Sequence, residues 1–276
     1  MSADLSDYLT RIGFDGTVRP DLATLKALHR AHLMAVPYED LDVQFGRPLT
    51  TDPAAAFEKV TARRRGGWCY EMNGSFGHAL GLAGFEVTRH AGEGDRPGSH
   101  LALTVELEEG TFVCDVGFGD GPAEPYPLAP GSFEIDGFEF KLEFQADGAW
   151  RFHNHRFGAA NGFAARGPDE AALAATCRFL QTDPSSTFVQ HATIFRRVPG
   201  GYQSLIDRTL RTVTPQGATP EQVEDAGSYV AILKDRFGLD VPEAADLWPA
   251  LCERHEAYER DRAARRAAKA AEAATH

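Results

Sequence analysis

One cysteine of this chain stands where its sulfur would be activated. It lies between a glycine pair and a segment able to open a helix, in the run Arg65-Gly66-Gly67-Trp68-Cys69-Tyr70-Glu71-Met72-Asn73. A helix N-terminus presents N–H groups without partners inside the helix and the positive end of the helix dipole, and both stabilise a thiolate. Since the thiolate is the attacking form of cysteine, Cys69 is the first candidate for a catalytic nucleophile.

A nucleophilic cysteine needs a base, and the base needs a group that orients it. His100 begins one arm of an expected β-hairpin, and Asp115 lies near the end of the other arm. A two-residue loop at Glu108-Glu109 would set Asp115 opposite Ala102, on the same face as His100. A three-residue loop without a bulge would place the two side chains on opposite faces, so the sequence permits this pairing without requiring it.

The alternative is that these two residues do no chemistry, with His100 a surface strand residue and Asp115 a turn-forming carboxylate. Asp115 lies inside the apolar run from Phe112 to Phe118. A carboxylate buried there is costly unless it has a partner, which favours the catalytic interpretation.

The other three cysteines show no spacing typical of a metal site or a disulfide framework. Cys114 points to the strand face opposite Asp115 and is expected to pack in the core. Cys177 and Cys252 lie in helical patterns, where we expect buried thiols that behave as small apolar groups.

Two histidine pairs and one glycine-rich run are weaker candidates. His29 with His32, and His153 with His155, have no third ligand at suitable spacing, so we expect no metal. The run 117–121 is rich in glycine but fails the dinucleotide fingerprint, because prolines follow where a helix should open. It is expected to be a flexible turn, or else a loop that offers N–H groups to an anionic ligand.

Composition excludes several classes of protein. The 276 residues include 43% apolar and 25% charged types, as in ordinary globular proteins, and no apolar run is long enough to span a membrane. A formal net charge of −12 argues against non-specific nucleic-acid binding. The acidic N-terminus lacks the features of a signal peptide, so a cytoplasmic location is expected.

The expected elements change in character along the chain. The first part is helical, with one helix capped by Asp21 and stopped by Pro37, and another capped by Asp52. Alternating strands follow, which predicts a small antiparallel barrel or sandwich. The expected helices are 22–32, 53–60, 72–82 and 170–179, with two short pieces in 221–237 and a solvated helix or frayed tail at 262–274. The expected strands are 101–107, 111–116, 138–144, 150–155, 187–198 and 202–212.

Several blocks of the chain resemble the arylamine N-acetyltransferases. That family's signature is Arg-Gly-Gly-x-Cys-x-Glu/Gln-x-Asn, and residues 65–73 match every fixed position. Residues 99–103 resemble the segment with the family's catalytic histidine, and residues 115–119 the segment with its aspartate. Residues 32–42 resemble a further block, except that Tyr38 and Asp40 replace the usual Phe and Asn. Residues 185–188 match more weakly.

The resemblance implies an α+β fold with a cysteine-protease-like catalytic core. Its parts would be an N-terminal helical bundle carrying the cysteine (1–84), a central antiparallel β-barrel carrying the histidine and aspartate (85–180), and a C-terminal α/β lid with a charged, alanine-rich helix or tail (181–276).

The resemblance also implies the reaction and its substrates. The donor would be acetyl-CoA, with no metal, and the acceptor a small aromatic amine or hydrazine. Transfer would be ping-pong through an acetyl-cysteine on Cys69, with His100 as base and Asp115 holding the imidazole. The resemblance places Tyr38, Phe118 and Phe188 at the acceptor pocket. Arg65, Glu71 and Asn73 are expected to give structural support to the site.

Arg65 is expected to pair with a carboxylate, and Glu71, two residues after the cysteine, is the candidate partner. The expected partners are small molecules, without nucleic acid or membrane, and the chain would be a monomer or homodimer.

Other functions are compatible with the same three residues. An amide synthase that releases a polyketide chain would keep them, while loading its acyl group from a carrier protein. A cysteine protease or transglutaminase-like enzyme would use the same groups without CoA. A non-enzymatic relative kept for binding is disfavoured by the presence of Cys69, His100 and Asp115 together.

Overall fold

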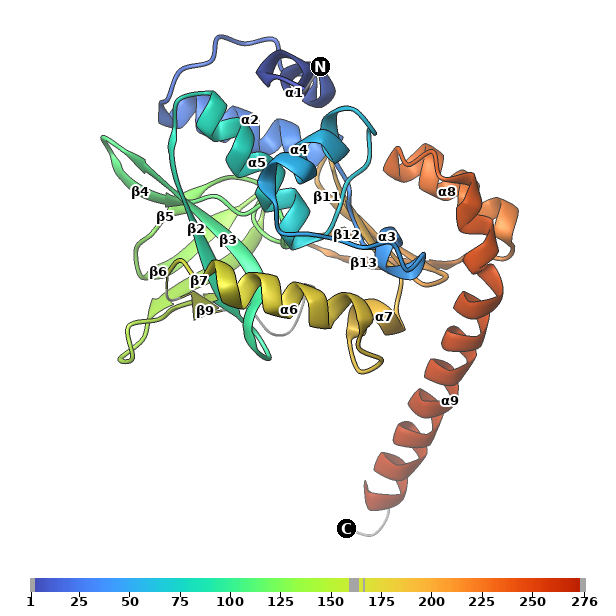
Figure 1. Cartoon of the computed structure of the whole chain (residues 1–276). Coiled ribbons are helices and arrows are strands. Elements are labelled where there is room, and N and C mark those ends of the chain that lie inside the picture. Colours follow the sequence, from blue (N-terminus) through green and yellow to red (C-terminus); the bar gives the residue numbers. More distant parts are fainter. Residues whose placement is uncertain (1–2, 159–163, 166, 274–276) are drawn as a thin grey trace.

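The N-terminal part of the chain is helical, as the sequence predicts (Figure 1). The computed structural model describes residues 3–158, 164–165 and 167–273. The caps are the expected ones: Asp21 accepts the N–H of Thr24, and Asp52 accepts that of Ala54. The helices are α1 (Leu5–Ile12), α2 (Leu22–Ala35), α3 (Leu41–Gln44), α4 (Pro53–Thr61) and α5 (Cys69–Leu82).

An antiparallel sheet of eight strands curls beside these helices (Figure 1). The hairpin that carries the candidate base has a two-residue loop, because Leu107 pairs with Gly110. This is the loop length that sets Asp115 opposite Ala102. In sheet order the strands are β5 (Tyr126–Pro127), β4 (Gly110–Val113), β3 (Pro97–Leu107), β2 (Glu86–Glu93), β9 (Ala164–Ala165), β8 (Trp150–His153), β7 (Phe138–Phe144) and β6 (Gly131–Ile135).

A second antiparallel sheet has five strands, of which four come from the C-terminal part of the chain and one from the N-terminal part. Its edge strand β1 contains only Tyr38 and Glu39, which pair with β10 about 155 residues later in the chain, at Phe195 and Ile194. In sheet order the strands are β1 (Tyr38–Glu39), β10 (Thr193–Val198), β11 (Gly201–Ile206), β12 (Thr209–Thr214) and β13 (Gly217–Gln222).

Three predictions of secondary structure between residues 187 and 237 are wrong. The strand predicted over 187–198 begins as a one-turn helix, α7 (Thr187–Gln190), because the Ser186 side chain caps it. The strand over 202–212 is a hairpin, turned by Asp207 at a positive φ of 49°. The two helical pieces over 221–237 are the end of β13 and a single helix, α8 (Ala226–Phe237).

The remaining helices complete the fold. α6 (Glu170–Thr182) packs on β3, as the pattern over 170–179 predicts. A short 3₁₀ helix (Pro242–Leu247) leads into α9 (Trp248–Ala273), which extends away from the body (Figure 1). α9 includes the predicted segment 262–274 except for residue 274, which lies outside the described residues. No helix in the described part of the chain is long and apolar enough to cross a membrane.

One hydrophobic core joins the elements that carry the candidate site. Buried residues of α2, α5, β3 and α6 belong to the same cluster, and Cys69 is one of its members. Because Leu101 and Leu103 of β3 are fully buried in this cluster, the strand that carries His100 is packed rigidly against the helix that begins at Cys69.

Candidate active site

Cys69 is the first residue of α5, as the sequence predicts. Trp68 precedes it at the N-cap and supplies no side-chain cap. The N–H groups of Cys69 and Tyr70 come before the first hydrogen bonds of the helix, in which Glu71 and Met72 donate to the Trp68 carbonyl. The sulfur therefore lies at the positive end of the helix, beside backbone N–H groups that precede its first hydrogen bonds.

His100 and Asp115 meet beside this sulfur. His100 Nε2 lies 2.6 Å from Asp115 Oδ2, and both residues are buried. Burial alone would lower the pKa of His100. The charge of Asp115 and hydrogen bonds to Asp115 and Cys69 outweigh it and raise this pKa to about 10. Because Asp115 occupies Nε2, Nδ1 is the ring nitrogen left for the Cys69 sulfur. The alternative of a surface histidine is therefore wrong.

Asp115 is held as a carboxylate by several donors. Asn73 Nδ2 donates to its Oδ1 at 2.7 Å, and the Gly117 N–H donates to the same oxygen at 2.9 Å. Burial would raise the pKa of Asp115, but His100, Asn73 and Gly117 together lower it. Asn73 also accepts the Val116 N–H at 2.9 Å, so it fixes the loop that carries the aspartate.

Two glycines allow the backbone to close around the cysteine. A Cβ on Gly117 would lie 2.6 Å from Asn73 Nδ2 and 2.9 Å from Cys69 Cα. A Cβ on Gly66 would overlap the carbonyl oxygen of Pro37. A side chain at Gly117 would push apart the segments that carry Cys69 and Asp115, and one at Gly66 would push the cysteine segment away from Pro37.

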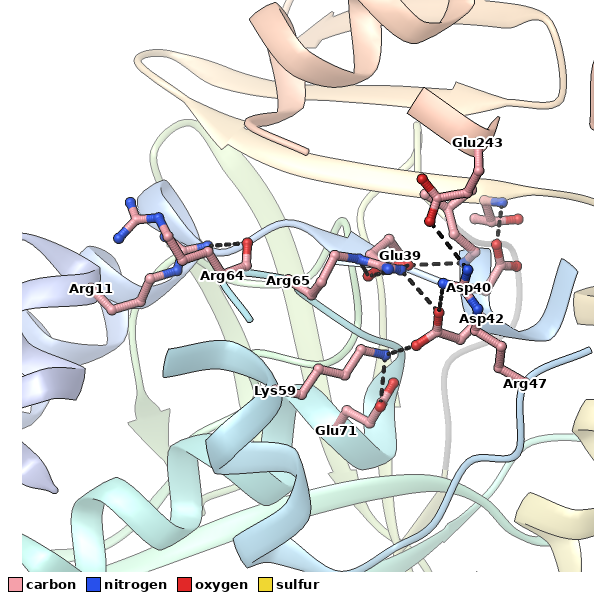
Figure 2. Close-up of polar contacts among 12 residues, drawn as sticks. Arg11, Glu39, Asp40, Asp42, Arg47, Lys59, Arg64, Arg65, Glu71 and Glu243 are labelled. Atoms are coloured by element: carbon pink, nitrogen blue, oxygen red, sulfur yellow. Dashed lines mark hydrogen bonds and ion pairs between the residues drawn. The ribbon is translucent and has the colours of Figure 1, made fainter. Parts of the chain in front are cut away.

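A buried network of charged groups anchors the cysteine segment (Figure 2). Arg65 makes two hydrogen bonds to Glu39, each 2.9 Å long, and a third to Asp42 at 3.3 Å. The expected partner of Arg65 was Glu71, and that prediction was wrong. Glu71 instead pairs with Lys59, which sequence reasoning missed because the two residues lie on different helices.

Lys59 lies between two acidic side chains. Its Nζ is 2.7 Å from Asp42 Oδ2 and 2.8 Å from Glu71 Oε1, and the residue is 5% exposed (Figure 2). Burial raises the pKa of Glu71 to about 7 even though Lys59 opposes the shift. A buried ion pair holds its partners in one geometry, because separating them would leave charges without solvent. The network thus fixes α5 against α3 and α4.

A cleft of about 490 Å³ opens onto the candidate residues. Tyr38, Phe118 and Phe188 all line it, where the resemblance places them. The Phe118 ring stands edge-on to His100, with centroids 5.4 Å apart. Phe195 of β10 also lines the cleft, and sequence reasoning missed it because its strand lies far along the chain.

Asp40 stands where the family usually has Asn, and it is 1% exposed. Its Oδ1 accepts the Thr193 N–H at 2.8 Å, while its Oδ2 is buried and has no hydrogen-bond partner among the described residues. Burial raises the pKa of Asp40 well above its ordinary value, which favours the neutral form of the carboxyl.

Neither histidine pair lines the cleft at Cys69, whereas Gly117, Phe118 and Asp120 of the run 117–121 do. Within the described ranges no group of three or more His, Cys, Asp or Glu side chains could hold a metal ion. His153 of β8 pairs with Glu143 of the neighbouring strand β7. Run 117–121 is the loop that carries Phe118, and the carbonyl of Asp120 accepts from His155.

The other cysteines are mostly buried, as expected. Cys114 and Cys177 are at most 2% exposed. Cys252, which the helical pattern predicts to be buried, is only partly buried.

Comparisons with known proteins agree with this geometry. The family model described as N-acetyltransferase matches residues 21–246. The arylamine N-acetyltransferase of Mycolicibacterium smegmatis is 33% identical, over 89% of this chain and 95% of that protein. The arylamine N-acetyltransferase / N-hydroxyarylamine O-acetyltransferase of Salmonella typhimurium is 31% identical, over 87% and 90%.

Solved structures show the same fold. The arylamine N-acetyltransferase of Mycobacterium marinum in complex with CoA superposes with a TM-score of 0.80 at 29% identity, over 87% of this chain and 94% of that one. The matching architecture, the matched family model and the relatives that span most of this chain lead to one conclusion. The chain belongs to the arylamine N-acetyltransferase family.

Proposed function

We propose that this protein transfers an acetyl group from acetyl-CoA to an arylamine or arylhydrazine, through an acetyl-cysteine on Cys69. The observation that carries the proposal is the His100–Asp115 contact of 2.6 Å beside a cysteine at a helix N-terminus. A cysteine so placed, with an oriented imidazole next to it, is the arrangement that acyl transfer through a thioester requires.

In the first half-reaction the Cys69 thiolate attacks the carbonyl carbon of the acetyl thioester. The carbonyl oxygen then carries the negative charge, and the N–H groups of Cys69 and Tyr70 at the start of α5 are the donors that we assign to it. The carbon–sulfur bond of acetyl-CoA breaks, and the CoA sulfur takes the proton of the His100 imidazolium as it leaves. The enzyme is left with an acetyl-cysteine and a neutral imidazole.

In the second half-reaction the amine nitrogen attacks the acetyl-cysteine carbonyl, and His100 takes a proton from that nitrogen. The bond to Cys69 breaks, which restores the thiolate–imidazolium pair and releases the acetylated amine. Asp115 holds the ring in one orientation and stabilises its charged form throughout. Only the two half-reactions together return the sulfur and the His100 proton to their starting state.

The acceptor site that we propose is the aromatic part of the cleft. Tyr38, Phe118 and Phe188 offer flat apolar surfaces on which an aryl ring can stack or pack edge-on. We assign Arg65, Glu71 and Asn73 the supporting role of holding the cysteine and aspartate segments in place.

Intact-mass measurement after exposure to acetyl-CoA tests donor and nucleophile together. The wild-type protein should gain one acetyl group, and the adduct should disappear when an arylamine is added. Cys69→Ala should gain none, while the control Cys177→Ala should react as wild type does. An adduct on Cys69→Ala, or transfer from a carrier protein but not from CoA, would contradict the proposal and favour the amide-synthase alternative.

A further inference from the structure

The helix that carries Phe188 is too short to be stable on its own. α7 contains four residues, Thr187–Gln190, and a single helical turn is unstable in isolation. At its start the Ser186 hydroxyl accepts the Phe188 N–H at 3.3 Å. The carbonyls at its other end have no partners within such a short helix and must find them elsewhere.

Gln44, the last residue of α3, supplies those partners. Its Nε2 lies 2.6 Å from the carbonyl oxygen of Phe188 and 3.0 Å from that of His191. The two carbonyls stand on either side of the end of α7, so one amide group closes the turn. The Phe188 ring packs edge-on against Trp68, with centroids 5.3 Å apart.

Arg254 of α9 decides which way the Gln44 amide points. Its Nη1 lies 2.6 Å from Gln44 Oε1. A guanidinium can only donate hydrogen bonds, so the amide must turn its oxygen to Arg254. That choice leaves both N–H bonds of the amide for the carbonyls of Phe188 and His191.

Asp207, in the turn after β11, holds the chain just beyond α7. Its Oδ1 accepts the Ala192 N–H at 3.0 Å and lies 3.9 Å from Arg254 Nη1. Its Oδ2 lies 2.6 Å from His191 Nδ1. Gln44, Asp207 and Arg254 thus come from three separate elements and together fix the backbone from Phe188 to Ala192. We call these three residues the α7 clamp.

We propose that Gln44, oriented by Arg254, is a positioning residue that sets where Phe188 stands in the acceptor wall. The inference rests on the proposed function, in which Phe188 contacts the acceptor. The clamp touches the backbone of α7 and makes no contact with Cys69, His100 or Asp115 in the described contacts. It should therefore act on the second half-reaction and leave acetylation of Cys69 largely unchanged.

Gln44→Glu is the sharpest test because it preserves the size of the side chain. The carboxylate keeps its contact with Arg254 but loses both N–H donors and faces two carbonyl oxygens. In a ping-pong reaction kcat/KM for acetyl-CoA reports the first half-reaction and kcat/KM for the arylamine reports the second. We expect the arylamine value to fall about tenfold, from two lost hydrogen bonds to partly buried carbonyls, and the acetyl-CoA value to change by less than about twofold.

Two further variants separate positioning from folding. Arg254→Met should lower the arylamine value in the same direction but less, while Arg254→Lys, which keeps a donor, should restore most of it. Gln222→Glu adds the same charge on the exposed part of β13 and is the matched control, expected to resemble wild type.

The outcomes distinguish the inference from the function on which it rests. The role of the clamp would be overturned if Gln44→Glu and Arg254→Met lowered both kcat/KM values in parallel, or if they lowered neither value. Turnover by the wild-type protein would still support acetyl transfer in either case. A wild-type protein that acetylates no arylamine would instead overturn the proposed function, whatever the variants do.

Discussion

His100 Nε2 and Asp115 Oδ2 lie 2.6 Å apart, and both residues are buried. Neighbouring hydrogen-bond donors keep the aspartate in its charged form. Asn73 and the Gly117 N–H lower the pKa of Asp115 against the effect of burial. The aspartate in turn raises the pKa of His100 to about 10, so the imidazole is held as a cation in the resting site. The pair is the basis of the first prediction.

Asp115→Asn should abolish most of the activity without unfolding the protein. The amide has the same shape but cannot stabilise the imidazolium, and we expect kcat for arylamine acetylation to fall on the order of a thousandfold. The pKa of His100 should fall as well, which moves the alkaline limb of the pH–rate profile to lower pH. The profile measures both effects. Asp235→Asn, on the exposed face of α8, is the control, and equal activity in the two variants would contradict the assignment.

Asp40→Asn should stabilise the protein, and more so at higher pH. Because the pKa of Asp40 is raised in the folded state, its contribution is fully present below its ordinary value of 3.8 and is lost as pH rises towards the folded value. The variant has no carboxyl to ionise, so it should gain about 1–3 kcal/mol near pH 8. Thermal unfolding of both proteins at pH 4.5 and pH 8 checks this. A difference that shrinks with rising pH would show that the sign is wrong.

Alkylation by iodoacetamide should fall first on Cys69. Burial raises the pKa of Cys114 well above its ordinary value and that of Cys177 to about 12, so both stay protonated at neutral pH. Cys69 has the His100 cation and the α5 N-terminus beside it. Peptide mapping by mass spectrometry over time gives the four rates. A Cys69 rate no faster than that of the partly exposed Cys252 would argue against an activated thiolate.

Lys59→Met should destabilise the fold strongly. It removes the cation between Asp42 and Glu71. Asp42 keeps Arg47 and Arg65, but the buried Glu71 carboxylate loses its ion-pair partner, a loss of about 3–5 kcal/mol. Denaturant unfolding measures the free energy. Lys234→Met, which removes an exposed lysine, should change the free energy of unfolding by less than about 1 kcal/mol. An equal change in the free energy of unfolding for the two variants would mean that the buried network stabilises the fold no more than an exposed ion pair does.

The local features of the site were predictable from the sequence. Glycines, a cysteine and a helix-opening segment within nine residues indicate an activated thiol, and hydrophobic alternation predicts the hairpin on which His100 and Asp115 lie. Such patterns are readable because helix and strand periods act over a few residues. The division into parts at about residues 85 and 180 stays a prediction.

Relationships between distant segments were decided only by the tertiary structure. The loop of two residues, which brings His100 to Asp115, was one of two open alternatives until the register of β3 and β4 selected it. Arg65 pairs with Glu39 instead of the nearby Glu71, because β1 crosses to β10 and carries Glu39 beneath the cysteine segment.

The candidate groups for acyl transfer can be identified from the sequence, since residue type and local spacing carry that information. The contacts that hold them become visible only in the folded chain: Lys59 lies between two carboxylates, and Gln44 lies against the carbonyl of Phe188. Those contacts join elements separated by up to 144 residues. They form because burial leaves a charge or a carbonyl no partner except the one that packing brings to it, and no local pattern records that partner.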